Sequence, residues 1–248
     1  MPININSINI YFIKQIMRFA HPSGIIRTLT LYNAIHNIAP QNKYILDAGC
    51  GNGGITFSLA NEYKDSQFVG VDINPNNINV AKSRMLKNPS INNVAFINGD
   101  LASFRCSKPV DIIYCIDVLE HIEDDVNVFN NFSRNLIDGG KLIIHVPSSP
   151  QRSFFNIDVN PQSDHVREGY KKDDIISKLI MAGLKMEMIT YTFGTFGQLA
   201  WFIHGLFRSV TFFFLWPIIY PLVWFLAYLD LINTNVKGNG LFIISIKQ

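Results

Sequence analysis

Short apolar runs alternate along the chain with longer segments in which apolar residues recur every three or four positions. The short runs predict buried strands at residues 43–49, 67–73, 93–100, 109–117, 140–147 and 184–192. The longer segments predict helices at residues 54–63, 74–86, 124–140 and 171–184. Strands and helices that alternate in this way are typical of a doubly wound parallel sheet, so the pattern predicts an α/β fold.

Four of the predicted strands carry an aspartate at or near their carboxyl end: Asp47, Asp72, Asp100 and Asp117. A single acid at a strand end is commonly a helix cap. In a doubly wound sheet, however, a ligand binds beyond the carboxyl ends of the strands. Four acids in register therefore predict one crevice that they surround.

A glycine-rich loop, ILDAGCGNGG, follows the first strand and places Gly49, Gly51 and Gly54 in the spacing G-x-G-x-x-G. Such a loop before a helix can bind the pyrophosphate of a dinucleotide. Asp47 argues against a pyrophosphate, because two like unit charges about 5 Å apart repel by roughly 3 kcal/mol at an effective dielectric of about 20. The same carboxylate would attract a ligand with an ammonium and a sulfonium group.

These acids match the parts of S-adenosylmethionine. Asp47 suits the ammonium group, Asp72 can accept hydrogen bonds from both ribose hydroxyls, and Asp100 can accept one from the adenine amino group. The residues therefore indicate S-adenosylmethionine, and a nicotinamide dehydrogenase is the minor alternative.

Five segments resemble, in order and spacing, the successive motifs of class I S-adenosylmethionine-dependent methyltransferases. They are ILDAGCGNG, VGVDINP, FINGDLASF, DIIYCIDVLEHI and LIDGGKLIIHVP, and they cover roughly residues 43–147. The resemblance implies a Rossmann-like sheet of seven strands with the last one antiparallel, in which 184–192 and 240–248 form the terminal pair. It also implies the product S-adenosylhomocysteine and these cofactor-binding residues: Asp47, Gly49, Cys50, Gly51, Asp72, Ile73, Asp100, Leu101, Cys115, Ile116 and Asp117.

Two histidines are candidates for a general base or an orienting group on the acceptor side. His165 lies in SDHVREGY, in the loop before the last core helix, where enzymes of this family often place substrate-side residues. The alternative is that this segment only locks the loop through Arg167 and Tyr170. His21, in an HPSG break between two helical stretches, either faces the pocket or lies in a surface turn. His145, inside the fifth predicted strand, is interpreted as a packing residue.

A third candidate, His121, follows Asp117 and Glu120 in DVLEHI. These three residues resemble the acidic-plus-histidine set with which some quinone-biosynthesis O-methyltransferases hold a divalent metal ion. The same segment occurs in metal-free relatives, where it caps and packs the next helix. The metal-free interpretation is favoured here, with the metal site as the alternative.

Two stretches lie outside the expected cofactor-binding core of residues 41–192 and 240–248. Residues 1–40 look helical and are interpreted as a cap, or lid, over the cofactor. Residues 193–239 form an apolar insertion without charge from 209 to 229, long enough to span a membrane. Both of its ends join neighbouring antiparallel strands, and Pro217 and Pro221 should break the run into shorter helices. A helical hairpin is therefore expected, acting as a substrate lid, a membrane contact or a homodimer contact.

Composition adds little beyond this apolar character. The net charge of +2 gives no reason to expect nucleic acid as a partner. Only 16% of the residues are charged, and 48% are hydrophobic. The three cysteines form no C-x-x-C pair, and the first residues lack the pattern of a secretory signal. A cytoplasmic protein is expected, with peripheral contact to the inner face of the membrane as an option.

The expected function is methyl transfer from S-adenosylmethionine to a hydrophobic small molecule or lipid-like acceptor, at oxygen. One alternative is methylation of a natural product at nitrogen or carbon. Another is a non-catalytic module that binds S-adenosylmethionine and docks through its apolar hairpin.

Overall fold

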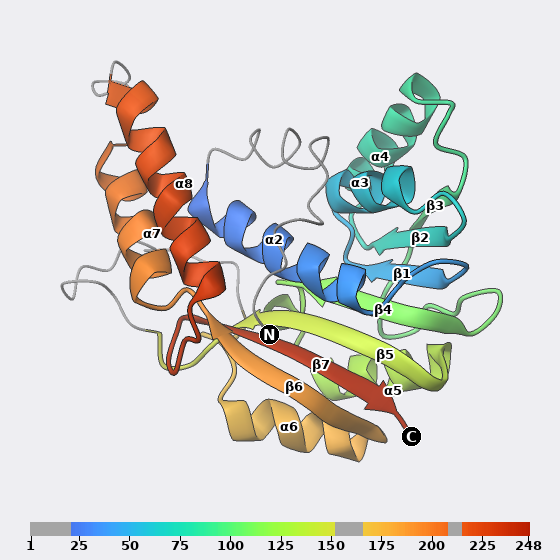
Figure 1. Ribbon diagram of the computed structural model, residues 1–248. Coiled ribbons are helices and arrows are strands. Elements are labelled where there is room, and N and C mark those ends of the chain that lie inside the picture. The colour runs from blue at the N-terminus through green and yellow to red at the C-terminus, as the bar shows by residue number, and fades with distance from the viewer. Residues whose placement is uncertain (1–20, 152–165, 208–214) are drawn as a thin grey trace.

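The computed structural model describes residues 21–151, 166–207 and 215–248, which form one mixed sheet with helices on both faces (Figure 1). The strands are β1 Tyr44–Ala48, β2 Gln67–Asp72, β3 Val94–Asn98, β4 Val110–Ile116, β5 Leu136–Pro147, β6 Leu184–Thr192 and β7 Gly240–Lys247. The helices are α2 Pro22–Asn37, α3 Gly54–Glu62, α4 Pro75–Lys87, the short 3₁₀ helix η2 Leu119–His121, α5 Asp125–Asn135, α6 Lys172–Met181, α7 Thr195–Phe207 and α8 Trp216–Ile232.

The seven strands lie in the order β3-β2-β1-β4-β5-β7-β6. The first five run parallel, and β7 runs antiparallel between β5 and β6. The predicted seven-stranded Rossmann-like sheet with an antiparallel last strand is thus confirmed. The strand order reverses between β1 and β4, which is where ligands bind in such sheets.

Successive residues of the strands point to opposite faces of the sheet and pack into two separate apolar cores. Ile45 of β1 packs with α2, α3 and α4, whereas the next residue, Leu46, packs with α5 and α6. Ile112 and Ile113 of β4 divide in the same way between the two cores. Because both faces of the sheet are covered, the strands read in the sequence as nearly continuous apolar runs.

The junction between α5 and β5 differs from the prediction. The helix expected over 124–140 ends at Asn135, and β5 begins directly at Leu136. Leu136 is fully buried and pairs with Val110 of β4, so its extended backbone gains more from the sheet than from another helical turn. The two glycines that suggested the helix end lie instead in an irregular part of β5 between Leu136 and Lys141.

The insertion between β6 and β7 forms a hairpin of α7 and α8, which also packs against α2 (Figure 1). Asp230, from the end of α8, closes this hairpin, because its carboxylate accepts from the backbone N–H groups of Phe193 and Gly197 at 2.9 and 3.0 Å. A side chain at Gly197 would lie 2.9 Å from the same carboxylate, so only glycine fits there. The hairpin thus starts and ends at the carboxyl edge of β5, where Gly240 pairs with Pro147.

The expectation that both prolines break the apolar run is wrong for Pro221. Pro217 lies in the first turn of α8, but Pro221 lies inside it and the helix continues to Ile232. Both prolines are exposed, so a backbone carbonyl that loses its donor there can bind water. Among the helices that the structure describes, none is long and apolar enough to cross a membrane.

The first half of the predicted cap, residues 1–20, lies outside the described residues. The described half contains α2, which begins at the N-cap His21 and crosses one face of the sheet. Its far end is tied to α3, because Tyr32 donates to Glu62 and His36 bonds to the Tyr63 hydroxyl at 3.2 Å.

Candidate functional site

The glycine loop after β1 has the geometry of a ligand cradle. Gly49, Gly51 and Gly53 have φ values of +83°, +52° and +73°, a region that L-residues with a side chain rarely occupy. A Cβ atom built on Gly51 would meet nothing within 4 Å, so this side of the loop is open to a ligand. Gly53, the N-cap of α3, was not singled out from the sequence, which pointed to Gly54 instead.

Asp47 lies beneath this loop and is almost fully buried. Its carboxylate accepts hydrogen bonds from the hydroxyls of Thr56 at 2.5 Å and Tyr114 at 2.9 Å. Burial raises the pKa of Asp47 to about 7, although these two hydrogen bonds oppose the shift and Asp72 adds to it. Nothing in the sequence pattern pointed to Thr56 or Tyr114 as partners of this acid.

The raised pKa of Asp47 changes the charge that the sequence predicted for this residue. The repulsion of a pyrophosphate assumed a fully ionised Asp47, whereas a carboxyl group with a pKa of about 7 is partly protonated at neutral pH. A bound ammonium group would favour the ionised form, so the preference for a cationic ligand stands, but binding must release a proton below that pH.

This proton linkage predicts a pH dependence of cofactor binding. The affinity for S-adenosylhomocysteine, which carries the same ammonium group, should rise about tenfold between pH 6 and pH 8 and then level off, because Asp47 ionises in this range. Asp47→Asn should bind more weakly at pH 8 and lose the dependence. Calorimetry at several pH values measures both, and a pH-independent wild type would contradict the linkage.

Asp72, at the end of β2, holds the glycine loop against the next turn. Its carboxylate accepts from the backbone N–H of Gly51 at 2.8 Å and from that of Asn74 at 2.8 Å. The adjacent Ile73 is 72% exposed. A carboxylate has further lone pairs for a ribose diol, so these bonds leave the suggested role open.

Asp100 and Leu101 follow β3 at the same edge. Asp100 is exposed and accepts from the backbone N–H of Ala102 at 2.9 Å, so it also caps a turn. Leu101 is buried, and its carbonyl accepts from the Asn131 side chain at 2.7 Å.

The end of β4 places Cys115 and Ile116, and the next residue Asp117, where the strand order reverses. Cys115 is fully buried, and burial holds the pKa of its thiol well above the ordinary value, so it is a neutral packing residue. Cys50, in the glycine loop, is neutral for the same reason. Both carboxylate oxygens of Asp117 have a partner. His145 bonds to one oxygen, and Arg27 of α2 forms an ion pair with the other at 2.5 Å.

The candidate metal ligands do not gather around one point. Within the described ranges, no group of three or more histidine, cysteine, aspartate or glutamate side chains could hold a metal ion. Asp117 is engaged by Arg27 and His145, Glu120 is buried, and His121 lies exposed at the end of η2. Burial, and then the charge of Asp117, raise the pKa of Glu120 to about 8.

His165 and His21 are the other two candidate histidines. His165 lies outside the described residues. His21 bonds to the Ser23 hydroxyl at 2.5 Å, and its ring packs edge-on against Trp201 and His204 of α7, with centroids 4.5 and 4.6 Å apart. His21 therefore lies between α2 and the hairpin rather than in a free surface turn.

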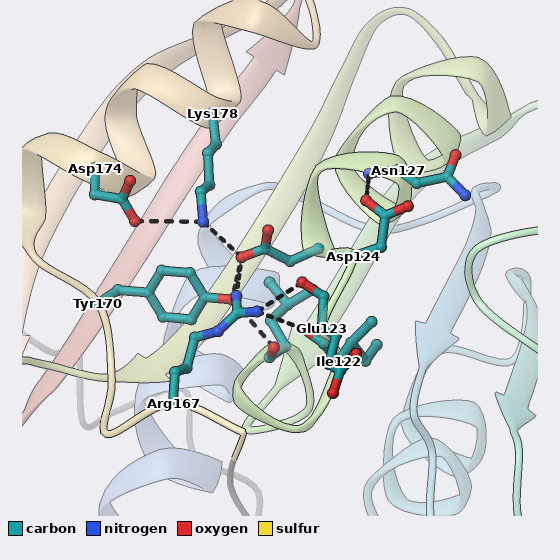
Figure 2. A network of polar contacts seen from close by, with 10 residues as sticks. Ile122, Glu123, Asp124, Asn127, Arg167, Tyr170, Asp174 and Lys178 are labelled. Carbon is teal, nitrogen blue, oxygen red and sulfur yellow. Dashed lines mark hydrogen bonds and ion pairs between the residues drawn. The ribbon is translucent and has the colours of Figure 1, made fainter.

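Arg167 and Tyr170 hold the segment after residue 165 in place (Figure 2). The sequence offered this locking of the loop as the alternative to a role for His165. Arg167 binds Asp125 and the carbonyls of Ile122 and Glu123, and the Tyr170 hydroxyl lies 2.7 Å from Asp125. Lys178 of α6 completes this cluster at 2.8 Å from Asp125. Val166, directly before Arg167, donates its backbone N–H to the Glu120 carbonyl. This bond brings the start of the segment beside the turn after β4.

Known proteins share this architecture. The methyltransferase domain family matches residues 40–186. A phosphoethanolamine N-methyltransferase of Arabidopsis thaliana is 30% identical over 56% of this chain and 27% of its own length. A ubiquinone biosynthesis O-methyltransferase of Coxiella burnetii is 29% identical over 54% of this chain and 57% of its own length.

The chain thus spans between about a quarter and just over half of these two relatives. The crystal structure of magnesium protoporphyrin IX methyltransferase from Synechocystis PCC 6803 with bound SAH superposes with a TM-score of 0.58. It is 16% identical, and the match covers 98% of this chain and 89% of that one, which shows the shared fold. With its motifs, its sheet order and a family match over more than half of its length, the chain belongs to the methyltransferase domain family and has the sheet of class I S-adenosylmethionine-dependent methyltransferases.

Proposed function

We propose that this protein transfers a methyl group from S-adenosylmethionine to a hydrophobic small-molecule or lipid-like acceptor, at an oxygen atom. The observation that carries the apolar acceptor is one face of α8. Ile218, Leu222, Phe225 and Ile232 follow one another on this face at helical spacing and are 71, 42, 56 and 43% exposed. We call these four residues the α8 apolar face.

The position of this face supports a role in acceptor binding. The hairpin leaves the sheet after Thr192 and returns at Gly240, at the edge where the parallel strands end. Exposed apolar surface is unfavourable in water by about 25 cal/mol per Å². The α8 apolar face would therefore cover an apolar acceptor or enter a membrane interface, and a second copy of the chain is the other way to bury it.

The cofactor would lie across the ends of β1 to β4, where its sulfonium group supplies an electrophilic methyl group. Asp47 and the glycine loop would hold the methionine end, and Asp72 and Ile73 would flank the ribose. The rest of the proposed site is made of Cys50, Asp100, Leu101, Cys115, Ile116 and Asp117. The open side of Gly51 and the buried carboxylate below it fit such a ligand.

Transfer to a hydroxyl requires a base, because the oxygen must lose its proton. His165 is proposed for this role, since Val166 bonds to the turn after β4, and His21 is proposed to orient the acceptor between α2 and the hairpin. The two relatives named above act at nitrogen and at oxygen by their names, so an N-methyltransferase is the second candidate.

The test combines turnover with membrane binding. Labelled S-adenosylmethionine should transfer its methyl group into a lipid extract, and the protein should co-sediment partly with liposomes. Ile218→Asp with Phe225→Asp should abolish sedimentation and raise KM for the acceptor at least about tenfold, because each side chain loses about 1.5–3 kcal/mol of apolar burial. S-adenosylhomocysteine affinity should not change.

Leu86→Asp is the matched control, because Leu86 is 85% exposed on α4, away from the hairpin. Label transfer without liposome binding would contradict the membrane contact and leave a closed lid. Binding of the cofactor without any transfer would support the non-catalytic alternative. Sedimentation that changes with protein concentration would indicate a dimer.

A further inference from the structure

Four polar residues from different elements meet at the carboxyl edge of the sheet. We call them the Asp117 cluster: Arg27 of α2, Asp117 after β4, His145 of β5 and Thr192 at the end of β6. His145 is only 2% exposed, and it uses both ring nitrogens. Its Nδ1 bonds to Asp117, and its Nε2 bonds to the Thr192 hydroxyl at 2.8 Å. A packing role, as interpreted from the sequence, therefore describes His145 incompletely.

The order hydroxyl, imidazole, carboxylate is also that of a hydrolytic triad, but the surroundings do not suit that chemistry. A triad needs free N–H donors beside the hydroxyl to stabilise an oxyanion. The Phe193 N–H, which follows Thr192, donates to Asp230. Thr192 itself is 4% exposed, and Gly240 packs so closely that a Cβ there would lie 2.3 Å from its hydroxyl. The arrangement fits a structural link better than a nucleophile.

The backbone of Asp117 shows what this link holds. Asp117 has φ +51°, and the left-handed conformation costs a non-glycine residue free energy that its surroundings must supply. Its N–H donates to the His145 carbonyl at 2.9 Å, and its carboxylate is held by the His145 ring and by Arg27. The Arg27 contact is a close ion pair and not an aligned hydrogen bond.

The turn held in this way lies directly against the glycine loop. Val118 fills the space next to Gly49, where a Cβ atom would lie 2.3 Å from a Val118 methyl group. A change in the backbone at Asp117 would move Val118 and, with it, the support of the loop that cradles the cofactor.

We propose that His145 and Arg27 are positioning residues for the cofactor: they hold the Asp117 turn, which packs Val118 against Gly49 and sets the shape of the glycine loop. This role rests on the proposed function, which places the cofactor in that loop. Arg27 also ties α2 to this turn, so the covering helix and the cofactor loop share one anchor.

Two substitutions of His145 separate the contacts that it makes. In His145→Asn the amide nitrogen stands near the place of Nδ1 and keeps the bond to Asp117. In His145→Gln it stands near Nε2 and keeps the contact with Thr192. Calorimetry with S-adenosylhomocysteine should show His145→Asn within about threefold of the wild type and His145→Gln at least about tenfold weaker, as loss of the Asp117 bond implies.

Thermal unfolding separates this role from a purely structural one. Equal affinities for the Asn and Gln variants, or affinities that follow their melting temperatures, would overturn the proposal. If both variants fail to fold, Arg27→Lys and Arg27→Met repeat the comparison on α2, where the Arg27 side chain is 33% exposed. Lysine should keep the affinity and methionine should lose about tenfold. Equal affinities would again overturn it.

Asp72→Ala tests the underlying site assignment separately. If it binds as tightly as the wild type, the cofactor does not lie in the glycine loop, and the positioning role falls with that assignment. If Asp72→Ala binds weakly while His145→Gln and Arg27→Met bind normally, the site stands and only the positioning role is wrong. Ser245→Ala is the control, because it removes a buried hydroxyl from the same sheet away from the Asp117 cluster.

Discussion

Replacing His165 with alanine is expected to lower turnover by about 10²–10⁴ while the affinity for S-adenosylhomocysteine stays nearly unchanged, because a general base acts only as the acceptor loses its proton. The assay uses the acceptor found in the lipid extract, and the loss should appear in kcat. His36→Ala is the control, since His36 lies at the far end of α2 and bonds to Tyr63.

Full activity of His165→Ala would remove the base from the proposed mechanism and leave positioning as the source of catalysis. Loss of cofactor affinity in the same variant would instead indicate a structural role for the segment. If a chelator abolishes the wild-type activity and a divalent ion restores it, the result would support the alternative metal site at His121.

Asp125→Asn is expected to cause a large loss of stability, about 3 kcal/mol in the free energy of unfolding, because it removes the buried charged partner of two partly buried cations, Arg167 and Lys178. Only 4% of the Asp125 side chain is exposed, and Arg167, Lys178 and Tyr170 all bind its carboxylate. Denaturant titration measures the loss. Glu187→Gln is the matched control, because Lys141–Glu187 is a half-exposed pair worth about 0–1 kcal/mol.

The same carboxylate predicts how stability depends on pH. Burial alone would raise the pKa of Asp125, but the hydrogen bonds from Lys178 and Tyr170 and the charge of Arg167 outweigh it and lower the pKa below 3.8. A lowered carboxyl pKa stabilises the fold fully above the ordinary value and loses this effect as the pH falls through the folded pKa. The difference between wild type and Asp125→Asn should therefore shrink below about pH 4, and a constant difference would contradict it.

Local patterns in the sequence determined the strands, most helices and the class of cofactor. Apolar runs marked the strands because both faces of the sheet are buried, and glycines marked the loop because only they adopt its backbone. The motifs then identified the methyltransferase architecture, including the antiparallel β7. The strands, the helices and the loop depend on residues close together in the chain, so the sequence reveals them directly, whereas the antiparallel β7 followed from the resemblance to the family.

Contacts between distant residues were decided only by the tertiary structure. The charge state of Asp47 depends on its burial and on hydrogen bonds such as the one from Tyr114, which lies 67 residues away. The role of His145 depends on Asp117 and Thr192, 28 and 47 residues away, which the strand order brings to one edge. Pro221 remains helical because solvent reaches its side of α8, and Leu136 joins β5 because Val110 offers a partner. Burial and partner choice are properties of the assembled sheet, and no local pattern contains them.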